Sequence, residues 1–275
     1  MSVPRYAYAV LLACAALVAV EIAARHAMDL KYYGSDSEVG FWLLPNQSGG
    51  SLLVDTFEIN AAGFNVGERY SLAGENDIIL VGDSLVAGPG IDHNNKLGPV
   101  LEKVAGLQVW PLSTGGWALT NELRALERKS IDGAEAIVFL LNAGDLGQPA
   151  EWTSDYDLPR ARPAIYLLYA LQKEFPIFRR PVRSLPVRRG NVEAEWRDFR
   201  SRVEAPVFII GYESVATTGQ KCQWIPEWIS DPAFCFDPIE RGEGNLMKDS
   251  IHLTEEGTAR LAAFIATKVD LSGVP

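Results

Sequence analysis

The sequence has few cysteines and histidines, the usual ligands of zinc, and none of the glycine-rich loops that bind nucleotides. Its 275 residues include only three cysteines and three histidines. They form neither a Cys-x-x-Cys nor a His-Glu-x-x-His pattern, which would indicate a zinc site. There is no Walker-type loop, and Gly88-Pro89-Gly90 is too short to match a dinucleotide fingerprint. We therefore expect neither a metal nor a cofactor.

Excess basic charge, internal repeats and low-complexity segments are lacking as well. The formal net charge is −10, so the basic surface of nucleic-acid-binding proteins is not expected. Hydrophobic residues make up 48% of the chain, which is enough for the core of a full α/β domain. Composition therefore excludes nucleic acid as a partner and favours a globular domain.

The first motif follows a short apolar run. Residues 78–81 (Ile-Ile-Leu-Val) predict a buried strand, and Gly82-Asp83-Ser84-Leu85 comes directly after it. Gly82 permits a tight turn out of the strand. Ser84 is then expected at the carboxyl edge of a sheet, where α/β folds carry their ligand chemistry. Alternatively, Ser84 is only the N-cap of the helix that follows.

The second motif is Asp249-Ser250-Ile251-His252, which begins 165 positions after Ser84. A serine hydroxyl needs a base before it can act as a nucleophile, and histidine is suited to that role near neutral pH. We expect Asp249 and His252 to share one face of a helical turn, so that the carboxylate fixes the imidazole tautomer. The alternative is a surface aspartate beside an incidental histidine. Together, the motifs predict a catalytic triad of Ser84, His252 and Asp249.

These residues resemble the SGNH/GDSL hydrolase superfamily, over roughly residues 76–270. The resemblance implies a three-layer α/β/α, flavodoxin-like fold with a parallel sheet. The family has its nucleophilic serine in the first sequence block and Asp-x-x-His in the fifth. Ser84, Asp249 and His252 match these blocks, and Leu253, Thr254 and Gly257 follow as the family pattern requires.

The second and third blocks of the family supply the donors of the oxyanion hole. The second block matches residues 113–117 (Ser-Thr-Gly-Gly-Trp), where Gly116 is the expected donor and Gly115 the alternative. The family's third block usually reads Gly-x-Asn-Asp, whereas this chain has Asn142-Ala143-Gly144-Asp145. Either Asn142 supplies the amide from two residues upstream, or one donor is missing. Loss of one donor typically costs about 3 kcal/mol of transition-state stabilisation.

Alternating strand and helix patterns predict a parallel sheet with helices on both faces. The expected strands are residues 77–81, 107–111, 135–141 and 206–212, and a final helix covers about 254–269. We expect three parts: an N-terminal segment 1–25, a small β-rich prelude 26–70 near the edge of the domain, and a hydrolase domain 71–275. The last contains a helical, arginine-rich insertion at 150–205, with an amphipathic stretch at 164–175.

The N-terminal segment is apolar from Tyr6 to Val20 and continues after Glu21 to Arg25. A membrane-spanning helix needs about 20 apolar residues. We therefore expect a single-pass membrane anchor. A cleaved signal peptide is one alternative, and a lipidated Cys14 within a loosely lipobox-like Leu-Leu-Ala-Cys stretch is another.

Cys222 and Cys235 flank an aromatic, proline-bearing loop, and their spacing suits a disulfide. Two unrelated buried thiols are the alternative. Disulfides persist in oxidising compartments. Together with the anchor, this predicts a bacterial inner-membrane protein whose catalytic domain is periplasmic or extracellular.

Positions 179–189 contain five arginines in an otherwise acidic chain. The simplest interpretation is a solvated loop. The alternative is a site for anionic groups, either phospholipid heads beside the anchor or an acidic polysaccharide.

From the resemblance, we expect a serine esterase that removes acyl groups, with acetyl the expected group, from bacterial surface or exported carbohydrate. A lipid ester is a further option, and polysaccharide-export or modification machinery is a candidate partner. An O-acyltransferase is the first alternative, since Trp117, Trp224 and Trp228 could exclude water from the site. A catalytically weakened module that binds a glycan or a partner protein is the second.

Overall fold

The computed structural model describes residues 5–51, 54–67, 77–131, 133–239 and 246–269. Its centre is a five-stranded parallel sheet in the order β6-β5-β7-β8-β9. The strands are β5 (Asp77–Gly82), β6 (Gln108–Ser113), β7 (Ala136–Leu141), β8 (Val207–Tyr212) and β9 (Ala233–Phe236). Counted along the chain this is order 2-1-3-4-5, the flavodoxin-like arrangement. The domain boundary predicted at residues 70 and 71 lies outside the described residues.

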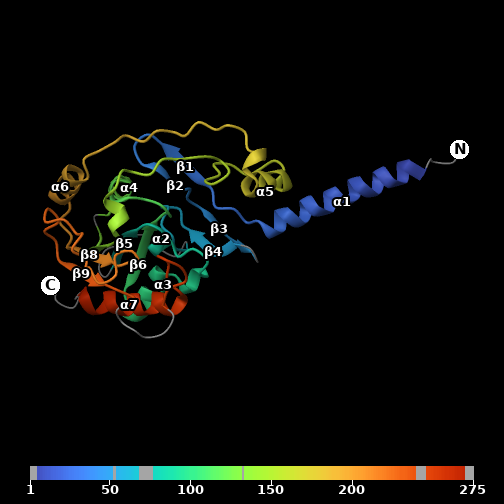
Figure 1. Ribbon diagram of the computed structural model, residues 1–275. Coiled ribbons are helices and arrows are strands. Elements are labelled where there is room, and N and C mark those ends of the chain that lie inside the picture. Colours follow the sequence, from blue (N-terminus) through green and yellow to red (C-terminus); the bar gives the residue numbers. More distant parts are fainter. Residues whose placement is uncertain (1–4, 52–53, 68–76, 132, 240–245, 270–275) are drawn as a thin grey trace.

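Helices cover both faces of the sheet and complete three layers (Figure 1). One face carries α2 (Ser84–Ala87), α3 (Leu97–Ala105) and α7 (Glu255–Lys268), and the other carries α4 (Leu119–Leu126) and α6 (Val192–Arg202). Strand β5 is buried along its whole length. Ile78 and Leu80 pack in the core under α3 and α7, whereas Ile79 and Val81 pack under α4 and α6. A continuous apolar run is stable as a strand only when both faces are covered in this way.

The three-layer α/β/α fold with a parallel sheet is confirmed. Four observed strands match the predicted ones to within one or two residues at their ends. The predicted last helix corresponds to α7, which begins after Thr254, whose hydroxyl accepts a hydrogen bond from the Gly257 N–H. The sequence analysis missed β9. This strand has four residues, is only partly buried, and pairs with β8 alone at the sheet edge.

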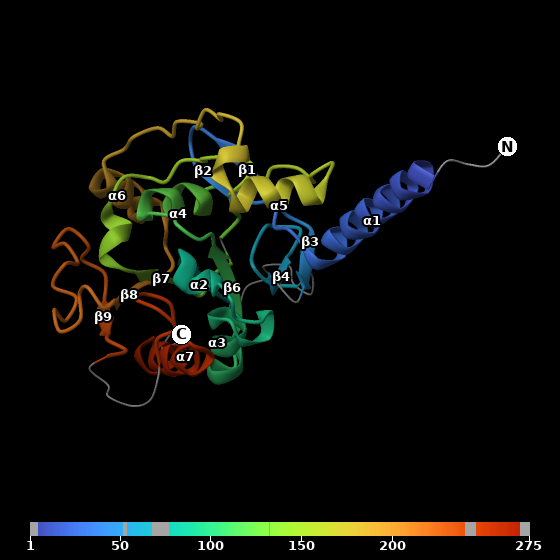
Figure 2. The same cartoon turned by 45° about the vertical axis from the view of Figure 1, so that its right-hand side comes forward.

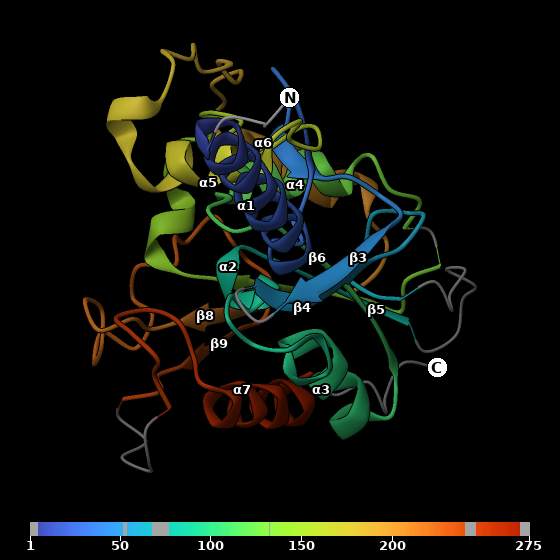
Figure 3. The same cartoon turned by 90° about the vertical axis from the view of Figure 1, so that its right-hand side faces the viewer.

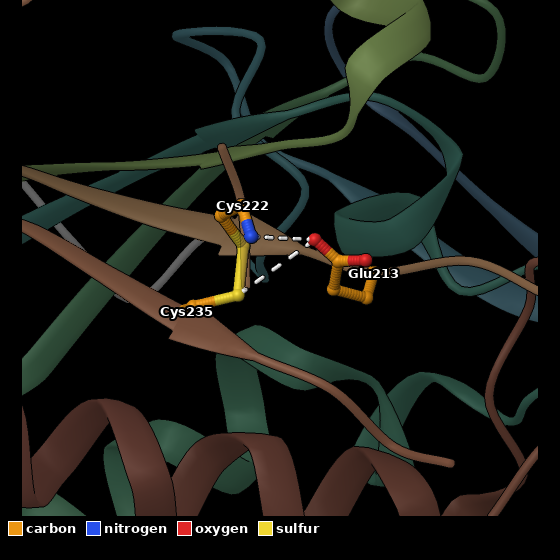
Figure 4. Close-up of side chains that lie close together, drawn as sticks. All are labelled: Glu213, Cys222 and Cys235. Carbon is orange, nitrogen blue, oxygen red and sulfur yellow. Dashed lines mark hydrogen bonds between the residues drawn. A yellow bond between two sulfur atoms is a disulfide. The ribbon is translucent and has the colours of Figure 1, made fainter. Parts of the chain in front are cut away.

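The expected disulfide joins Cys222, in the loop after β8, to Cys235 on β9 (Figure 4). The buried Glu213 lies beside it, and its Oε1 accepts a 2.7 Å hydrogen bond from the Cys222 N–H. A Cβ at Gly211 would lie 2.7 Å from the Cys222 sulfur, so the approach of the loop requires glycine there. Because the two sulfurs are bonded to each other, this cluster does not offer thiolates to a metal.

The prelude forms two antiparallel hairpins. They are β1 (Tyr33–Asp36) with β2 (Gly40–Leu43), and β3 (Gln47–Ser51) with β4 (Val54–Ile59). Buried polar side chains at α4 hold the first hairpin. Asn121 Nδ2 donates to the Val39 carbonyl (2.7 Å), and the Trp117 indole donates to the Phe41 carbonyl (2.7 Å). Such bonds would be costly to leave unmade in a buried interface, so they fix the prelude against the sheet domain.

Residues 150–205 divide into a peripheral part and a core part. Helix α5 (Tyr166–Glu174) and the 3-10 turn η3 (Pro176–Phe178) lie at the periphery, beside α1 (Figure 2). Helix α6 packs on the sheet instead. Its Trp196 and Phe199 rings lie 5.2 and 5.7 Å from the ring of Phe139 on β7. α6 is therefore a layer helix of the core, and the peripheral part is shorter than the predicted insertion.

Helix α1 (Arg5–Ala27) extends away from the body of the protein (Figure 1). Its segment Tyr6–Ala27 is long and apolar enough to cross a membrane, and its most apolar stretch has no residue buried inside the protein. An N-terminal signal sequence has the same properties. The expectation of an N-terminal apolar helix is therefore confirmed.

Reduction of the Cys222–Cys235 bond should lower the free energy of unfolding by about 3 kcal/mol, because a cross-link over a loop of this length restricts the unfolded chain. Urea unfolding with and without reductant measures the loss. The Cys222→Ser/Cys235→Ser variant should match the reduced protein. Cys14→Ser, at the exposed free cysteine of α1, should behave as wild type. Equal stability with and without reductant would contradict this account.

Candidate active site

Ser84 lies in the first turn of α2, directly after β5, at the carboxyl end of the sheet. Strand β5 lies between β6, the next strand along the chain, and β7, the strand after that. This is the topological switch point where open α/β sheets bind ligands. Asp83 caps the short helix, because its Oδ1 accepts a 2.9 Å hydrogen bond from the Leu85 N–H. Asp83 rather than Ser84 is therefore the N-cap. The Ser84 hydroxyl lies 3.4 Å from the other Asp83 oxygen, Oδ2, which is at the limit of a hydrogen bond and leaves the hydroxyl available to a closer acceptor.

His252 and Asp249 lie in the segment before α7. Asp249 Oδ1 accepts hydrogen bonds from the N–H groups of Ile251 (2.9 Å) and His252 (2.8 Å). The segment is therefore a turn closed by the Asp249 side chain, and not the helical turn that the spacing suggested. Tyr212 at the end of β8 holds this turn, since its hydroxyl donates to the Ile251 carbonyl (2.7 Å). The N–H of His252, followed by that of Ile251 and by the imidazole, holds the pKa of Asp249 well below its usual range.

The structure brings the three predicted residues into one hydrogen-bonded chain. His252 Nδ1 lies 2.8 Å from Asp249 Oδ2, and His252 Nε2 lies 3.0 Å from Ser84 Oγ. With the ring proton on Nδ1 facing the ionised Asp249, Nε2 is an acceptor for the Ser84 hydroxyl. The His252 side chain is 25% exposed, so solvent and substrate can reach the base. The arrangement is that of a nucleophile, a base and an orienting carboxylate.

The glycine pair after β6 adjoins Ser84. A Cβ on Gly115 would lie 3.6 Å from the Ser84 Cβ, whereas a Cβ on Gly116 would meet no atom within 4 Å. Gly116 has φ +83°, in the left-handed region that favours glycine. Gly115 is therefore the glycine next to the nucleophile, while Gly116 shapes the turn. The role of either N–H in an oxyanion hole stays a prediction.

Asn142 follows β7, and its side chain is directed into the protein. Its Nδ2 donates to Asp145 Oδ2 (2.9 Å) and lies 3.4 Å from Asp83 Oδ2, while its Oδ1 accepts from the Gly144 N–H (2.8 Å). An amide nitrogen has two hydrogens, and carboxyl oxygens occupy both. In this conformation the amide is not offered to a substrate, so the predicted oxyanion role would require Asn142 to leave these partners.

No protein-family model and no curated protein sequence matches the chain. Solved structures with a similar fold include the psychrotrophic esterase EstA from Pseudoalteromonas sp. (15% identity, TM-score 0.44, 72% of this chain and 100% of that one). A G-D-S-L family protein from Desulfitobacterium hafniense DCB-2 shares 14% identity (TM-score 0.44; 71% and 100%). A carbohydrate esterase family 2 enzyme from Corynascus thermopiles shares 15% (TM-score 0.44; 77% and 70%). The similarity is one of fold.

Three carboxyl groups are buried near one another at the floor of the site. Burial raises the pKa of Asp145 to about 8, and the nearby charge of Asp83 adds to this effect. Burial also raises the pKa of Asp83. The pKa of Glu122 is raised well above its usual range by complete burial and then by the charges of Asp145 and Asp83. Burial and mutual repulsion therefore disfavour simultaneous ionisation of the three groups.

Glu122 is the residue that the sequence analysis missed. It lies on α4, and neither of its carboxyl oxygens has a hydrogen-bond partner among the described residues. A signal was present, because Glu122 follows Leu119 by three residues and precedes Leu126 by four. That spacing puts the acid on the apolar face of the helix, where it must be paired or protonated.

A cavity of about 150 Å³ adjoins Ser84 between the sheet domain and the prelude. The sheet domain contributes Ser84, Ala87 and Gly115 to its lining, and the prelude contributes Leu43, Phe57 and Ile59. A larger cavity of about 220 Å³ lies beyond Leu43 and Thr114, which line both cavities, but no triad residue lines it. The triad therefore indicates the smaller cavity as the substrate site, and the prelude forms one of its walls.

Replacing Glu122 by methionine should stabilise the protein by about 1–3 kcal/mol, because an unpartnered buried carboxyl is removed. The gain should be larger at about pH 7.5 than at about pH 4.5. A carboxyl whose pKa is higher in the folded state costs stability as the pH rises, since the unfolded chain releases its proton first. Urea unfolding at the two pH values measures both effects.

Glu122→Gln is the matched control. It removes the titrating group but keeps unpartnered polar atoms. Relative to wild type, Glu122→Gln should therefore become more stable from about pH 4.5 to about pH 7.5, as Glu122→Met does. At about pH 4.5 it should lack the stabilisation that Glu122→Met gains from losing the polar atoms. A Glu122→Met gain that is equal at both pH values, or a loss, would contradict the protonated cluster.

Proposed function

We propose that this protein is a serine ester hydrolase of the SGNH/GDSL type. The observation that carries the proposal is the hydrogen-bonded chain from Ser84 through His252 to Asp249, with distances of 3.0 and 2.8 Å. A serine hydroxyl does not attack an ester without a base, and the base needs a fixed tautomer. The alignment of these three groups meets both requirements of acyl chemistry.

In the proposed reaction, Ser84 Oγ attacks the ester carbonyl carbon while His252 Nε2 takes the hydroxyl proton. Asp249, which is ionised because its pKa is strongly lowered, stabilises the imidazolium. His252 then returns the proton to the leaving alcohol, which departs and leaves the acyl group on Ser84. Water, deprotonated by His252, attacks that acyl carbon, releases the acid and restores the Ser84 hydroxyl.

We expect main-chain N–H groups to hold the negative charge that develops on the carbonyl oxygen. The candidates are the N–H groups of Ser84 and Gly116, with Gly115 as the alternative to Gly116. A Cβ added to Gly115 would lie 3.6 Å from the Ser84 Cβ, and this closeness supports a donor on this loop. Asn142 is the less suitable donor, since its amide is bonded to the buried carboxyls.

We propose short acyl esters, with acetyl the expected group, on a carbohydrate at the bacterial surface or in export. The small size of the cavity at Ser84 supports a short acyl group. The motif resemblance supports a carbohydrate alcohol. Hydrolysis is favoured over transfer to another alcohol, because Trp117, Trp224 and Trp228 are not among the residues that line the cavity at Ser84. The three tryptophans pack in or against the hydrophobic core instead.

We propose that the catalytic domain acts outside the cytoplasm, anchored in the inner membrane by α1. The apolar length of α1 supports the anchor, and the Cys222–Cys235 disulfide supports an oxidising compartment. This location is where surface and exported carbohydrates are modified. Polysaccharide-export or modification machinery is the partner expected there.

The triad predicts turnover of p-nitrophenyl acetate that depends on Ser84. Ser84→Ala and His252→Ala should each lower kcat/KM by at least about a thousandfold, and Asp249→Asn by a similar factor because the wrong tautomer is then favoured. The release of nitrophenol measures the rates, with circular dichroism as the control for folding. Wild type without activity, or activity that survives Ser84→Ala, would contradict the proposal. Absence of turnover would favour the non-catalytic binding module.

Leu43 should control the acyl-length preference, because its side chain lines both the cavity at Ser84 and the larger one. Leu43→Ala should join the two cavities and raise the octanoate-to-acetate ratio of kcat/KM by about tenfold or more. Phe57→Ala is the matched control, since Phe57 lines the cavity at Ser84 but neither of the neighbouring cavities. An equal change in both variants, or none in Leu43→Ala, would contradict the role of Leu43.

A further inference from the structure

Helix α5 has two apolar faces, and the protein covers only one of them. Tyr166 and Tyr169 are buried, in a small cluster with Leu30 that also contacts α1. On the opposite face, Leu168 and Leu171 are 45% and 40% exposed. A second apolar face on a peripheral helix adds no stability to a domain surrounded by water, because its side chains are not buried. This face therefore indicates that another molecule or a membrane covers it.

The exposed apolar surface continues beyond α5 into η3. Ile177 is 85% exposed, the highest value among the large hydrophobic side chains of the residues that the structure describes. Outside α1, ten such side chains are exposed in the described residues, and seven of them fall between positions 165 and 182. We call these seven the α5 patch: Ile165, Leu168, Leu171, Phe175, Ile177, Phe178 and Val182. Their concentration in one segment marks an interaction surface.

The α5 patch is joined to the apolar helix α1 by hydrogen bonds. Glu21 accepts from the N–H groups of Tyr166 and Leu167, both at 2.9 Å, and so satisfies the first turn of α5. Arg25 bonds Glu21 (2.8 Å) and donates to the Ala164 carbonyl (2.6 Å). This explains the acidic residue within the apolar run. Figures 1, 2 and 3 all show α5 beside the end of α1 that adjoins the body of the protein.

The length of the apolar run sets the depth of this junction. At 1.5 Å per residue, Tyr6 to Val20 spans about 22 Å, which is shorter than the hydrocarbon core of about 30 Å. The segment that is long and apolar enough to cross, Tyr6–Ala27, includes Glu21, so a membrane crossed by α1 would reach this level. Because α5 begins at the level of Glu21, its exposed face meets the boundary between hydrocarbon and headgroups.

Basic side chains lie at the C-terminal end of the patch segment. Arg180 and Arg183 are exposed and have no ion-pair partner within the part of the chain that the structure describes. Arg179, by contrast, lies 3.6 Å from Asp157. The chain has a net charge of −10, so exposed cations next to an exposed apolar face are unusual in it. They would complement a partner surface that has an apolar interior and anionic groups at its boundary with water. A bilayer with acidic lipids has this composition.

We propose that the α5 patch lies in the outer interface of the membrane that α1 crosses, with Arg180 and Arg183 at anionic lipid headgroups. The segment then serves as a second, in-plane attachment that holds the catalytic domain in one orientation above the bilayer. The inference requires that α1 is retained, and it does not depend on the esterase reaction.

Spin labels on the full-length chain in vesicles test the proposal. One label is placed at Ile177→Cys and a control label at Val215→Cys, a residue after β8 that is 52% exposed, both in a Cys14→Ala background. The vesicles are phosphatidylcholine alone, or phosphatidylcholine with about one third phosphatidylglycerol. Collision rates with oxygen, which dissolves in hydrocarbon, and with a water-soluble nickel chelate are compared.

The label at 177 should be several-fold less accessible to the nickel chelate than the label at 215, and more accessible to oxygen, in the anionic vesicles. Arg180→Gln with Arg183→Gln should increase nickel access at 177 in anionic vesicles and leave it unchanged in neutral ones. Equal nickel access at 177 and 215 would overturn the proposal and leave the patch to a protein partner. No effect of the arginine changes would overturn their assignment to anionic lipid.

Discussion

The hydrogen bond between Ser84 and His252 is the interaction on which the candidate site depends, because it joins positions 168 residues apart. One end is fixed by β5, whose burial on both faces determines where the chain turns at Ser84. The other end is fixed by the turn around Asp249, which Tyr212 ties to the end of β8. Neither motif positions its side chains without the sheet. The parallel register of β5, β7 and β8 therefore brings the two motifs into hydrogen-bond contact, in the arrangement that the proposed reaction requires.

The floor of the site carries a stability cost that the rest of the fold offsets. Asp83, Asp145 and Glu122 are buried together, and Asn142 bridges the two aspartates with its amide. The Asn142 amide is thereby bonded to the buried carboxyls and is not directed at the substrate cavity. The carboxyls hold the turns after β5 and β7 in place, while burial keeps their pKa values high. The buried carboxyl groups are thus expected both to make the segment around Ser84 rigid and to make the free energy of unfolding depend on pH.

Local patterns were sufficient to predict the strands of the sheet and the residues of the candidate triad, because each strand and each of the two motifs consists of residues close in sequence. The run at 78–81 is apolar enough to be a two-sided strand, and Asp249 and His252 are three residues apart. Features that arise from contacts between distant segments were not predicted. Strand β9 is held by pairing with β8 and by the disulfide. Helix α6 packs on the core through contacts with Phe139. The prelude forms a wall of the cavity because hydrogen bonds from α4 hold its first hairpin. The inward rotation of Asn142 also depends on carboxyls from two different loops.

The central claim is that Ser84 is an activated nucleophile. Labelling with a fluorophosphonate, followed by peptide mass mapping, tests it most directly because no substrate needs to be known. The account predicts a single adduct on Ser84, formed quickly in the wild type and at a greatly reduced rate in His252→Ala, since the base then no longer accepts the hydroxyl proton. No adduct on Ser84, or an adduct whose rate is unaffected by the loss of His252, would contradict it.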